Sequence, residues 1–234
     1  MNGSNYFMKS DIFCILALLT WASCNSSGLN NHSSTQDSLK TRGVISINKD
    51  SAKFESTEII CDTVYKNKGY KLSLRTFDSA NEDETKFNTI FILYKLINRQ
   101  YTEIFKDSIF NTFQEAKFED FNNDKVKDIL IQNFSDVRSN WAYYLYLVDT
   151  SHDLLKKIRG FQEIKNPTYI PRYDLIDNYV MSGRNWTSFY KIQGDSIKDF
   201  DIVIYDGEND NGKTTYDKDY NKAIKTILTK EKNR

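Results

Sequence analysis

The sequence of 234 residues predicts a mainly β protein, in which an antiparallel meander forms a sandwich or a propeller-like domain and a short helix follows at the C-terminal end. Three observations support this prediction. From Val44 onward, aromatic and β-branched residues alternate with polar residues at the period of two that is typical of strands. Short polar turns separate these segments. Two segments, 89–96 and 143–148, are apolar on both faces, as strands buried between two layers are. Periodicity leaves the choice between sandwich and propeller open.

Short polar turns delimit the predicted strands. Three of them, Asn67–Gly69, Asn98–Gln100 and Gln193–Asp195, carry Gly or Asn residues that tolerate tight-turn dihedral angles. This spacing indicates hairpins that follow one another along the chain. The predicted strands are 57–65, 70–77, 88–96, 101–109, 116–121, 128–134, 142–148, 179–182, 188–192 and 199–205.

The last segment has a helical period instead. Tyr216, Tyr220 and Ile224 recur every four residues, and Ile227 follows three residues later. Lysines gather toward the carboxyl end, where cations favour a helix terminus. We therefore expect one amphipathic helix over Asp217–Lys230.

Charge and histidine content argue against several functions. The chain has 32 Lys plus Arg against 32 Asp plus Glu, so it lacks the basic excess expected of a nucleic-acid-binding protein. With two histidines, His32 in a polar linker and His152 in a turn, it lacks the residues for His-based nucleophilic catalysis or a multi-His metal site. Aromatic residues make up 14% of the chain, and their large rings allow a sizeable core. We expect a protein without catalytic activity.

The N-terminal segment predicts export. The apolar run Ile12–Trp21 spans ten residues, where a membrane-spanning helix needs about 20, so residues 1–23 are expected to be a signal peptide. The run ends in Leu19–Cys24, which resembles a bacterial lipoprotein signal with Ala and Ser before the modified cysteine. We expect Cys24 to carry a lipid anchor. The alternative is an ordinary signal-peptidase site with an incidental cysteine.

The rest of the chain divides into a tether and one domain. Residues 24–43 are rich in Ser and Asn and predict a flexible linker, and residues 44–234 predict a single β-rich domain. No acidic run follows the anchor cysteine, which favours a periplasm-facing protein of the bacterial envelope over a surface-exposed one. Cys61 would then be the only free thiol of the mature chain, and burial is the commoner state for such a residue.

One loop has the spacing of a calcium site. Residues 118–130 read FEDFNNDKVKDIL, which places oxygen-bearing side chains at alternate positions of a loop bounded by strands. Ca²⁺ takes six to eight oxygen ligands at flexible distances, whereas Mg²⁺ demands stricter geometry. The predicted calcium ligands are the side chains of Asp120, Asn122, Asp124 and Asp128 and the carbonyl oxygen of Val126.

This loop is not an EF-hand. Lys125 stands where an EF-hand has an invariant Gly, and Ile131 stands where it has a bidentate Glu. Three carboxylates in one short loop repel one another unless they are solvated or neutralised. The alternative to a calcium loop is therefore a polar turn with three solvated acids.

The loop resembles the calcium loop of FG-GAP and VCBS-type repeats, and of a family of periplasmic lipoproteins that are immunity proteins against secreted lysozyme-like effectors. A repeat propeller would show the loop several times, so the single copy favours the immunity family. After the loop, Ser139–Tyr143 and Asn166–Pro167 follow the family order, and the similarity spans about Glu115–Ile197. Lys125 departs from the Gly or Asn that is usual at its position in this family.

A second short motif resembles a partner-binding element. Ser182, Gly183, Arg184 and Trp186 resemble the S-G-x-x-Y loop that bacterial lysozyme inhibitors insert into the enzyme's cleft, with Trp in place of Tyr. The resemblance implies that the Ser hydroxyl and the Arg guanidinium reach the catalytic carboxylates while the ring occupies a sugar subsite. The alternative is an ordinary hairpin tip whose Trp packs on the sheet.

Three functions follow from these observations. The first is a calcium-stabilised, membrane-tethered inhibitor of a lysozyme-like cell-wall hydrolase. The second is a carbohydrate-binding or adhesion module that uses aromatic rings as stacking platforms. A glycosidase with paired carboxylates ranks last, because the sequence does not place any two acids at the separation of about 5 to 9 Å that such chemistry needs.

Overall fold

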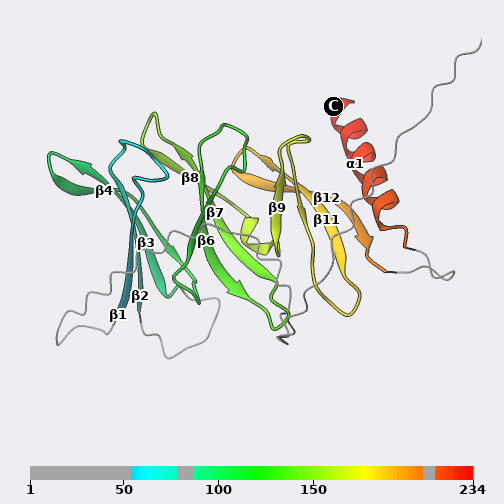
Figure 1. The fold of residues 1–234 in the computed structure, drawn as a ribbon, viewed down its shortest axis with the longest axis horizontal. Coiled ribbons are helices and arrows are strands. Elements are labelled where there is room, and N and C mark those ends of the chain that lie inside the picture. Colours follow the sequence, from blue (N-terminus) through cyan, green and yellow to red (C-terminus); the bar gives the residue numbers. More distant parts are fainter. Residues whose placement is uncertain (1–53, 78–86, 208–213, 234) are drawn as a thin grey trace, which may run out of the picture. The chain divides into compact units, whose positions relative to one another are not determined.

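The computed structural model describes residues 54–77, 87–207 and 214–233, and these ranges hold twelve strands, a 3₁₀ helix and one α-helix (Figure 1). The strands are β1 (Phe54–Ile60), β2 (Tyr70–Phe77), β3 (Thr89–Ile97), β4 (Gln100–Ile109), β5 (Ala116–Glu119), β6 (Asp128–Ser135), β7 (Trp141–Asp149), β8 (Leu154–Ile158), β9 (Pro167–Ile170), β10 (Leu175–Asn178), β11 (Trp186–Gln193) and β12 (Ser196–Tyr205). The helices are η1 (Phe161–Glu163) and α1 (Tyr216–Lys232).

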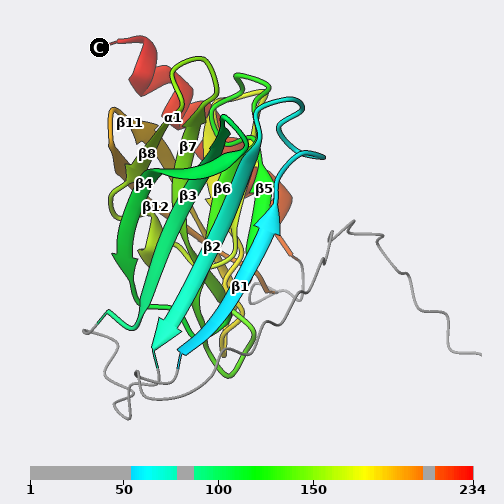
Figure 2. The same cartoon turned by 90° about the vertical axis from the view of Figure 1, so that its left-hand side faces the viewer.

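The strands form three four-stranded sheets in chain order. The first sheet is β1-β2-β3-β4, the middle sheet is β5-β6-β7-β8, and the third sheet has the order β12-β11-β10-β9. Figure 2 shows the first sheet with its four strands side by side. All the pairings between neighbouring strands are antiparallel. The prediction of a mainly β meander with a C-terminal helix is confirmed, and the packing of sheets on sheets is that of a sandwich.

The middle sheet is buried on both faces. Along β7, Tyr144 and Tyr146 pack in a core with Leu72 and Phe91 of the first sheet, whereas Leu145 packs in a second core. That second core includes residues of β9, β10 and η1. Successive side chains of a strand point to opposite faces, so one apolar strand supplies both cores. This explains the continuous apolar run that the sequence shows at 143–148.

A third core joins the third sheet to the helix. Ala223, Ile224 and Ile227 of α1 pack against Leu175, Phe189 and Ile204 of the sheet. The three helix residues lie at spacings of one and three, which puts them on one face of α1. The helix covers the sheet face that does not contact the middle sheet, as expected for an amphipathic helix.

One strand prediction, 179–182, is wrong, and two others, 57–65 and 116–121, are wrong in part because they extend beyond the ends of β1 and β5. The segment predicted as 57–65 leaves the sheet after Ile60, because the main chain of Cys61 accepts hydrogen bonds from the amides of Val64 and Tyr65 in a tight turn. The predicted strand 179–182 is not a strand, and its only pairing is an isolated bridge between Val180 and Trp186. Strands β8, β9 and β10 have no counterpart among the predicted ranges.

The predicted tight turns are confirmed, and each contains at least one residue with positive φ. Asn98 and Arg99 join β3 to β4 with φ of 51° and 65°, and Gly194 joins β11 to β12 with φ of 66°. Gly69 combines a φ of 65° with close packing, since a Cβ atom there would lie 2.9 Å from the Cβ of Leu96. An L-residue at this position would meet both constraints at once.

Candidate functional site

The predicted calcium loop connects β5 to β6 and has a backbone suited to tight wrapping. Asn123 and Lys125 have φ of 59° and 69°, in the left-handed region that L-residues seldom adopt. Lys125 therefore takes a backbone conformation that Gly and Asn adopt more readily. The presence of Lys at position 125 therefore does not prevent the turn.

The loop carboxylates hold the backbone of the loop. Asp120 accepts hydrogen bonds from the amides of Asn122 (3.1 Å), Asn123 (2.6 Å) and Lys125 (2.9 Å). Asp124 accepts from the amide of Val126 at 2.7 Å and from the side-chain amide of Asn122 at 2.9 Å. These hydrogen bonds fix the backbone of the loop.

Asp128 is the buried member of the set. Its side chain is fully buried, and it accepts hydrogen bonds from the amides of Phe121 at 2.8 Å and Val148 at 3.0 Å. Burial disfavours the charged form and raises the pKa of this carboxyl to about 7, against the lowering effect of the two amides. The charges of Asp120 and Asp124 raise it further. A cation beside Asp128 would offset the cost of its ionisation.

The donor set fits Ca²⁺ in its chemistry. A carboxylate offers about four lone-pair sites, so Asp124 and Asp128, which each accept two hydrogen bonds here, keep acceptor capacity for an ion. All the candidate ligands are hard oxygen atoms, which Ca²⁺ prefers. In the conformation described, however, no three acidic, His or Cys side chains of the described residues converge as a metal-binding group.

The predicted partner-binding motif lies in the connection from β10 to β11. The main chains of Val180 and Trp186 exchange two hydrogen bonds, at 2.8 and 3.2 Å, which closes a five-residue loop, Met181–Asn185. Gly183 and Arg184 are exposed at its tip. Trp186 is half-buried and begins β11, so its ring is part of the loop's base rather than its tip.

The loop is also braced internally. The Ser182 hydroxyl donates to the carbonyl of Arg184, and the Ser182 amide donates to the side chain of Asn185 at 3.0 Å. The Asn185 side chain in turn donates to the hydroxyl of Tyr179 at 2.8 Å. Every polar side chain of the loop except Arg184 is therefore used to hold its shape.

Asn140 clamps the loop to the middle sheet. This residue is buried, with 1% of its surface exposed, and it precedes β7. Its Oδ1 atom accepts from the Met181 amide at 2.8 Å, and its Nδ2 atom donates to the Met181 carbonyl at 2.9 Å. One side chain thus pairs with both main-chain groups of a residue 41 positions away.

A polar network supports the clamp. Asp136 accepts from Nδ2 of Asn140 at 2.9 Å and from the ammonium of Lys165 at 2.9 Å. These donors hold the pKa of the Asp136 carboxyl well below its usual range. Asn166 donates to Oδ1 of Asn140 at 3.0 Å and to the carbonyl of Tyr179 at 2.9 Å. The sequence analysis singles out the segments that contain Asn140 and Asn166. It does not predict that these residues hold the loop, because their hydrogen-bond partners lie far away along the chain.

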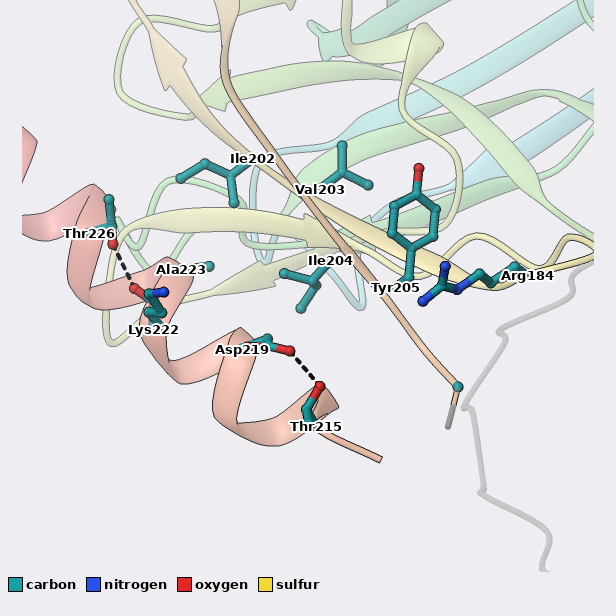
Figure 3. Close-up of a pocket in the computed structure, with 11 residues that line it drawn as sticks. Arg184, Ile202, Val203, Ile204, Tyr205, Thr215, Asp219, Lys222, Ala223 and Thr226 are labelled. Carbon is teal, nitrogen blue, oxygen red and sulfur yellow. Dashed lines mark hydrogen bonds between the residues drawn. The ribbon is translucent and has the colours of Figure 1, made fainter. Parts of the chain in front are cut away.

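Arg184 points from the loop toward a groove. Its guanidinium lies over the ring of Tyr205 at 4.7 Å, and it makes no ion pair with any residue the structure describes. Arg184 and Tyr205 line a groove of about 410 Å³ between the edge strand β12 and α1 (Figure 3). Ile204 and Lys222 line it as well. The cation–π contact orients the guanidinium of Arg184 over the Tyr205 ring.

The two loops lie at opposite ends of the middle sheet. The calcium loop joins β5 to β6, whereas Asp136 and Asn140 belong to the next connection, from β6 to β7. Successive hairpin connections of a meander alternate between the two ends of the strands. Strand β6 has eight residues, which corresponds to a separation of about 25 Å.

The cysteines fall into two groups. Cys24, the predicted lipidation site, lies outside the described residues, as do the predicted signal peptide and tether. Within the described ranges, none of the helices has the length and apolar character needed to cross a membrane. Cys61 is fully buried, as expected, and burial raises the pKa of its thiol to about 11.

Comparison with known proteins gives no relative. No family model matches the chain, and neither a curated protein nor a solved structure does. The resemblance to the immunity family therefore depends only on the residues of the two loops and the segments between them.

Proposed function

We propose that the protein is a non-catalytic, calcium-stabilised binding protein of the bacterial envelope, anchored through Cys24, that inhibits a lysozyme-like cell-wall hydrolase. In this proposal, Arg184 at the tip of the loop Met181–Asn185 contacts the target, and Asp120, Asn122, Asp124, Val126 and Asp128 hold the ion. The chain acts by occupying the hydrolase cleft and carries out no chemistry of its own.

The observation that carries the proposal is the preorganisation of an exposed loop. Binding costs less free energy when the contacting segment is already ordered in its bound conformation. Five residues are held here by a main-chain bridge at the base, by the clamp of Asn140 and by internal hydrogen bonds. The asparagine is itself buried and precedes a strand of the middle sheet, whereas the loop belongs to the third sheet.

The free guanidinium suits the chemistry of the target. Hydrolases of this class place two carboxylates about 5 to 9 Å apart in an open cleft. Arg184 presents a planar, permanently charged group that can pair with a carboxylate through two hydrogen bonds. The contact with Tyr205 reduces the rotamer freedom that Arg184 would lose on binding.

Calcium has a structural part in the proposal. Ionisation of Asp128 is costly because its side chain is fully buried, and this side chain connects the loop to Val148 of β7. An ion shared by Asp128, Asp124 and Asp120 would neutralise three carboxylates that otherwise repel. Because the loop lies about 25 Å from Asn140, the ion would stabilise the domain without touching the partner.

The test compares two exposed arginines that are alike except in position. Arg184→Ala should raise the inhibition constant against a lysozyme-like hydrolase by at least about tenfold, as expected for losing a charge-assisted hydrogen bond. Arg172→Ala is the matched control, since Arg172 is also exposed and stacks on Tyr173 at 5.3 Å. Equal inhibition by the wild type and Arg184→Ala would overturn the role of the loop.

The anchor has a separate test. Metabolic labelling with a fatty acid should mark the wild-type chain and should not mark Cys24→Ser. A label that persists in this variant would exclude Cys24 as the attachment site.

Carbohydrate binding is the alternative function, and the geometry near the loop favours it less. A sugar stacks on an open aromatic face, but the guanidinium of Arg184 already lies over the Tyr205 ring at 4.7 Å. Trp186 is half-buried at the start of β11. Retention on immobilised peptidoglycan that survives Arg184→Ala, with no inhibition of the hydrolase, would favour this alternative.

A further inference from the structure

A second surface feature of the protein is a lysine-lined pocket beside the calcium loop. Three connections come together there: the one between β1 and β2, the loop between β5 and β6, and the turn between β7 and β8, which contributes Thr150. The Tyr65 hydroxyl joins the first two by donating to the carbonyl of Lys127 at 2.6 Å. The pocket is lined by Val64, Tyr65, Lys66, Lys68, Lys125, Val126, Lys127 and Thr150.

The charge of this pocket is of one sign. Four of its eight lining residues are lysines, and none is acidic. The whole chain has equal numbers of basic and acidic residues, so the pocket departs from the average composition. Among the described residues, none of these four lysines forms an ion pair with a carboxylate.

The lysines differ in how they are held. Lys68 is partly buried and donates to the carbonyl of Thr150 at 2.6 Å, which fixes its ammonium in the wall of the pocket. Lys66, Lys125 and Lys127 are exposed. Their flexible stems can turn the charges onto a ligand at the centre, because an ammonium is a compact point charge with three donors.

We infer that this pocket binds a phosphate group. A hollow lined by charges of one sign concentrates counter-ions, and a multiply charged anion relieves the mutual repulsion of the four ammonium groups. The pocket has a volume of about 210 Å³. Small-molecule sites usually enclose about 300 to 1,000 Å³, so the space suits a phosphate group rather than a whole nucleotide or oligosaccharide.

The phosphate could be a free anion or part of a lipid headgroup, and the chemistry recognised is the same. If the ligand is a phospholipid headgroup, the end of the domain that carries the pocket would lie against the membrane. A soluble phosphate would leave this end free. Two arms of one experiment distinguish these sources.

The experiment measures binding of inorganic phosphate to the full chain by ³¹P NMR titration in calcium-free buffer of low ionic strength. The double variant Lys66→Gln/Lys127→Gln should bind roughly tenfold more weakly or worse, since each lysine supplies a charge-assisted hydrogen bond. The matched control is Lys218→Gln/Lys225→Gln, which removes two exposed charges from α1. It should bind as the wild type does.

The second arm uses sedimentation with vesicles of phosphatidylglycerol or of phosphatidylcholine, and every chain in this arm also carries Cys24→Ser, so that the proposed lipid anchor does not itself bring the protein to the vesicles. Sedimentation with phosphatidylglycerol that the pocket variant loses and the helix control keeps would assign the site to lipid headgroups. Phosphate binding without such sedimentation would assign it to a soluble phosphate.

Two outcomes would overturn the inference: no binding in either arm, or equal binding by the pocket variant and the helix control. Lys66→Arg/Lys127→Arg keeps the charges and should retain binding. Thermal melts of all the variants show whether a loss of binding reflects a loss of folding.

Discussion

Replacement of Asn140 by alanine should loosen the loop Met181–Asn185 while the fold persists. The substitution removes a buried side chain that forms hydrogen bonds with Asp136, Asn166 and both main-chain groups of Met181. These four interactions have donor–acceptor distances between 2.8 and 3.0 Å. Each contributes about 1 kcal/mol net to folding, so their sum is about 4 kcal/mol.

Water lowers this figure. Met181 is 38% exposed, and its main-chain groups can be solvated once Asn140 is gone. We therefore expect Asn140→Ala to lower the free energy of unfolding by about 2 to 4 kcal/mol. Urea denaturation measures this change. Hydrogen exchange measures the loop itself, and the Met181 amide should exchange about tenfold to a hundredfold faster when its acceptor is removed.

Asn111→Ala is the matched control for this experiment. Asn111 is also buried, with 1% of its surface exposed, and its side chain donates to the carbonyl of Gln132. Asn111→Ala should lower the free energy of unfolding. The Met181 amide should then exchange faster only to the extent that global unfolding has become more frequent. Unchanged exchange of Met181 in Asn140→Ala would refute the clamp, and with it the preorganisation on which the proposed function depends.

Three further predictions concern the ion, the polar network and the thiol. Calcium at a hundredfold excess over its dissociation constant should stabilise the full chain by about 2.7 kcal/mol, measured by thermal melts. Asp124→Ala should abolish this stabilisation. The control Glu103→Ala removes an exposed charge from β4 and should keep it. The pKa of Asp136 is lowered in the folded state, so its stabilising effect is present above the ordinary carboxyl range near pH 4 and is lost as the pH falls below it. Asp136→Asn should flatten that part of the stability curve, and an unchanged slope would contradict the stabilisation of the Asp136 carboxylate by Asn140 and Lys165. A thiol reagent at neutral pH should label Cys61 only after denaturation, because the thiol is fully buried and its pKa is raised to about 11.

The sequence predicts the strands whose side chains alternate clearly or are wholly apolar. Strand β2 has the predicted bounds, and β3, β4, β6 and β7 differ from prediction by one residue at each displaced end. Strand β8 was not predicted because its central Lys156 and Lys157 hide the alternation, and β9 begins with Pro167 and has four residues. Tertiary packing, rather than local pattern, makes such segments strands.

The candidate site is predictable only where its residues are close in sequence. The calcium loop occupies nine consecutive positions, so its spacing can be recognised directly, and Arg184 belongs to a five-residue motif. The clamp cannot be found this way, because Asn140 and Met181 are 41 positions apart and an isolated asparagine carries no sign of its partner. Burial of such a polar group becomes meaningful only when its hydrogen bonds are known.

In the proposed function, the arrangement of the two loops limits how calcium would affect partner binding. Asp128 begins β6 and its carboxylate contacts β7, and both strands are buried on both faces of the middle sheet. At the other end of these strands lie Asp136 and Asn140, which hold Met181. An ion at the first end therefore reaches the second only through the stability of the two strands. Removing calcium should lower the melting temperature while leaving the affinity of the folded chain for its partner unchanged, because the clamp and Arg184 keep all of their contacts.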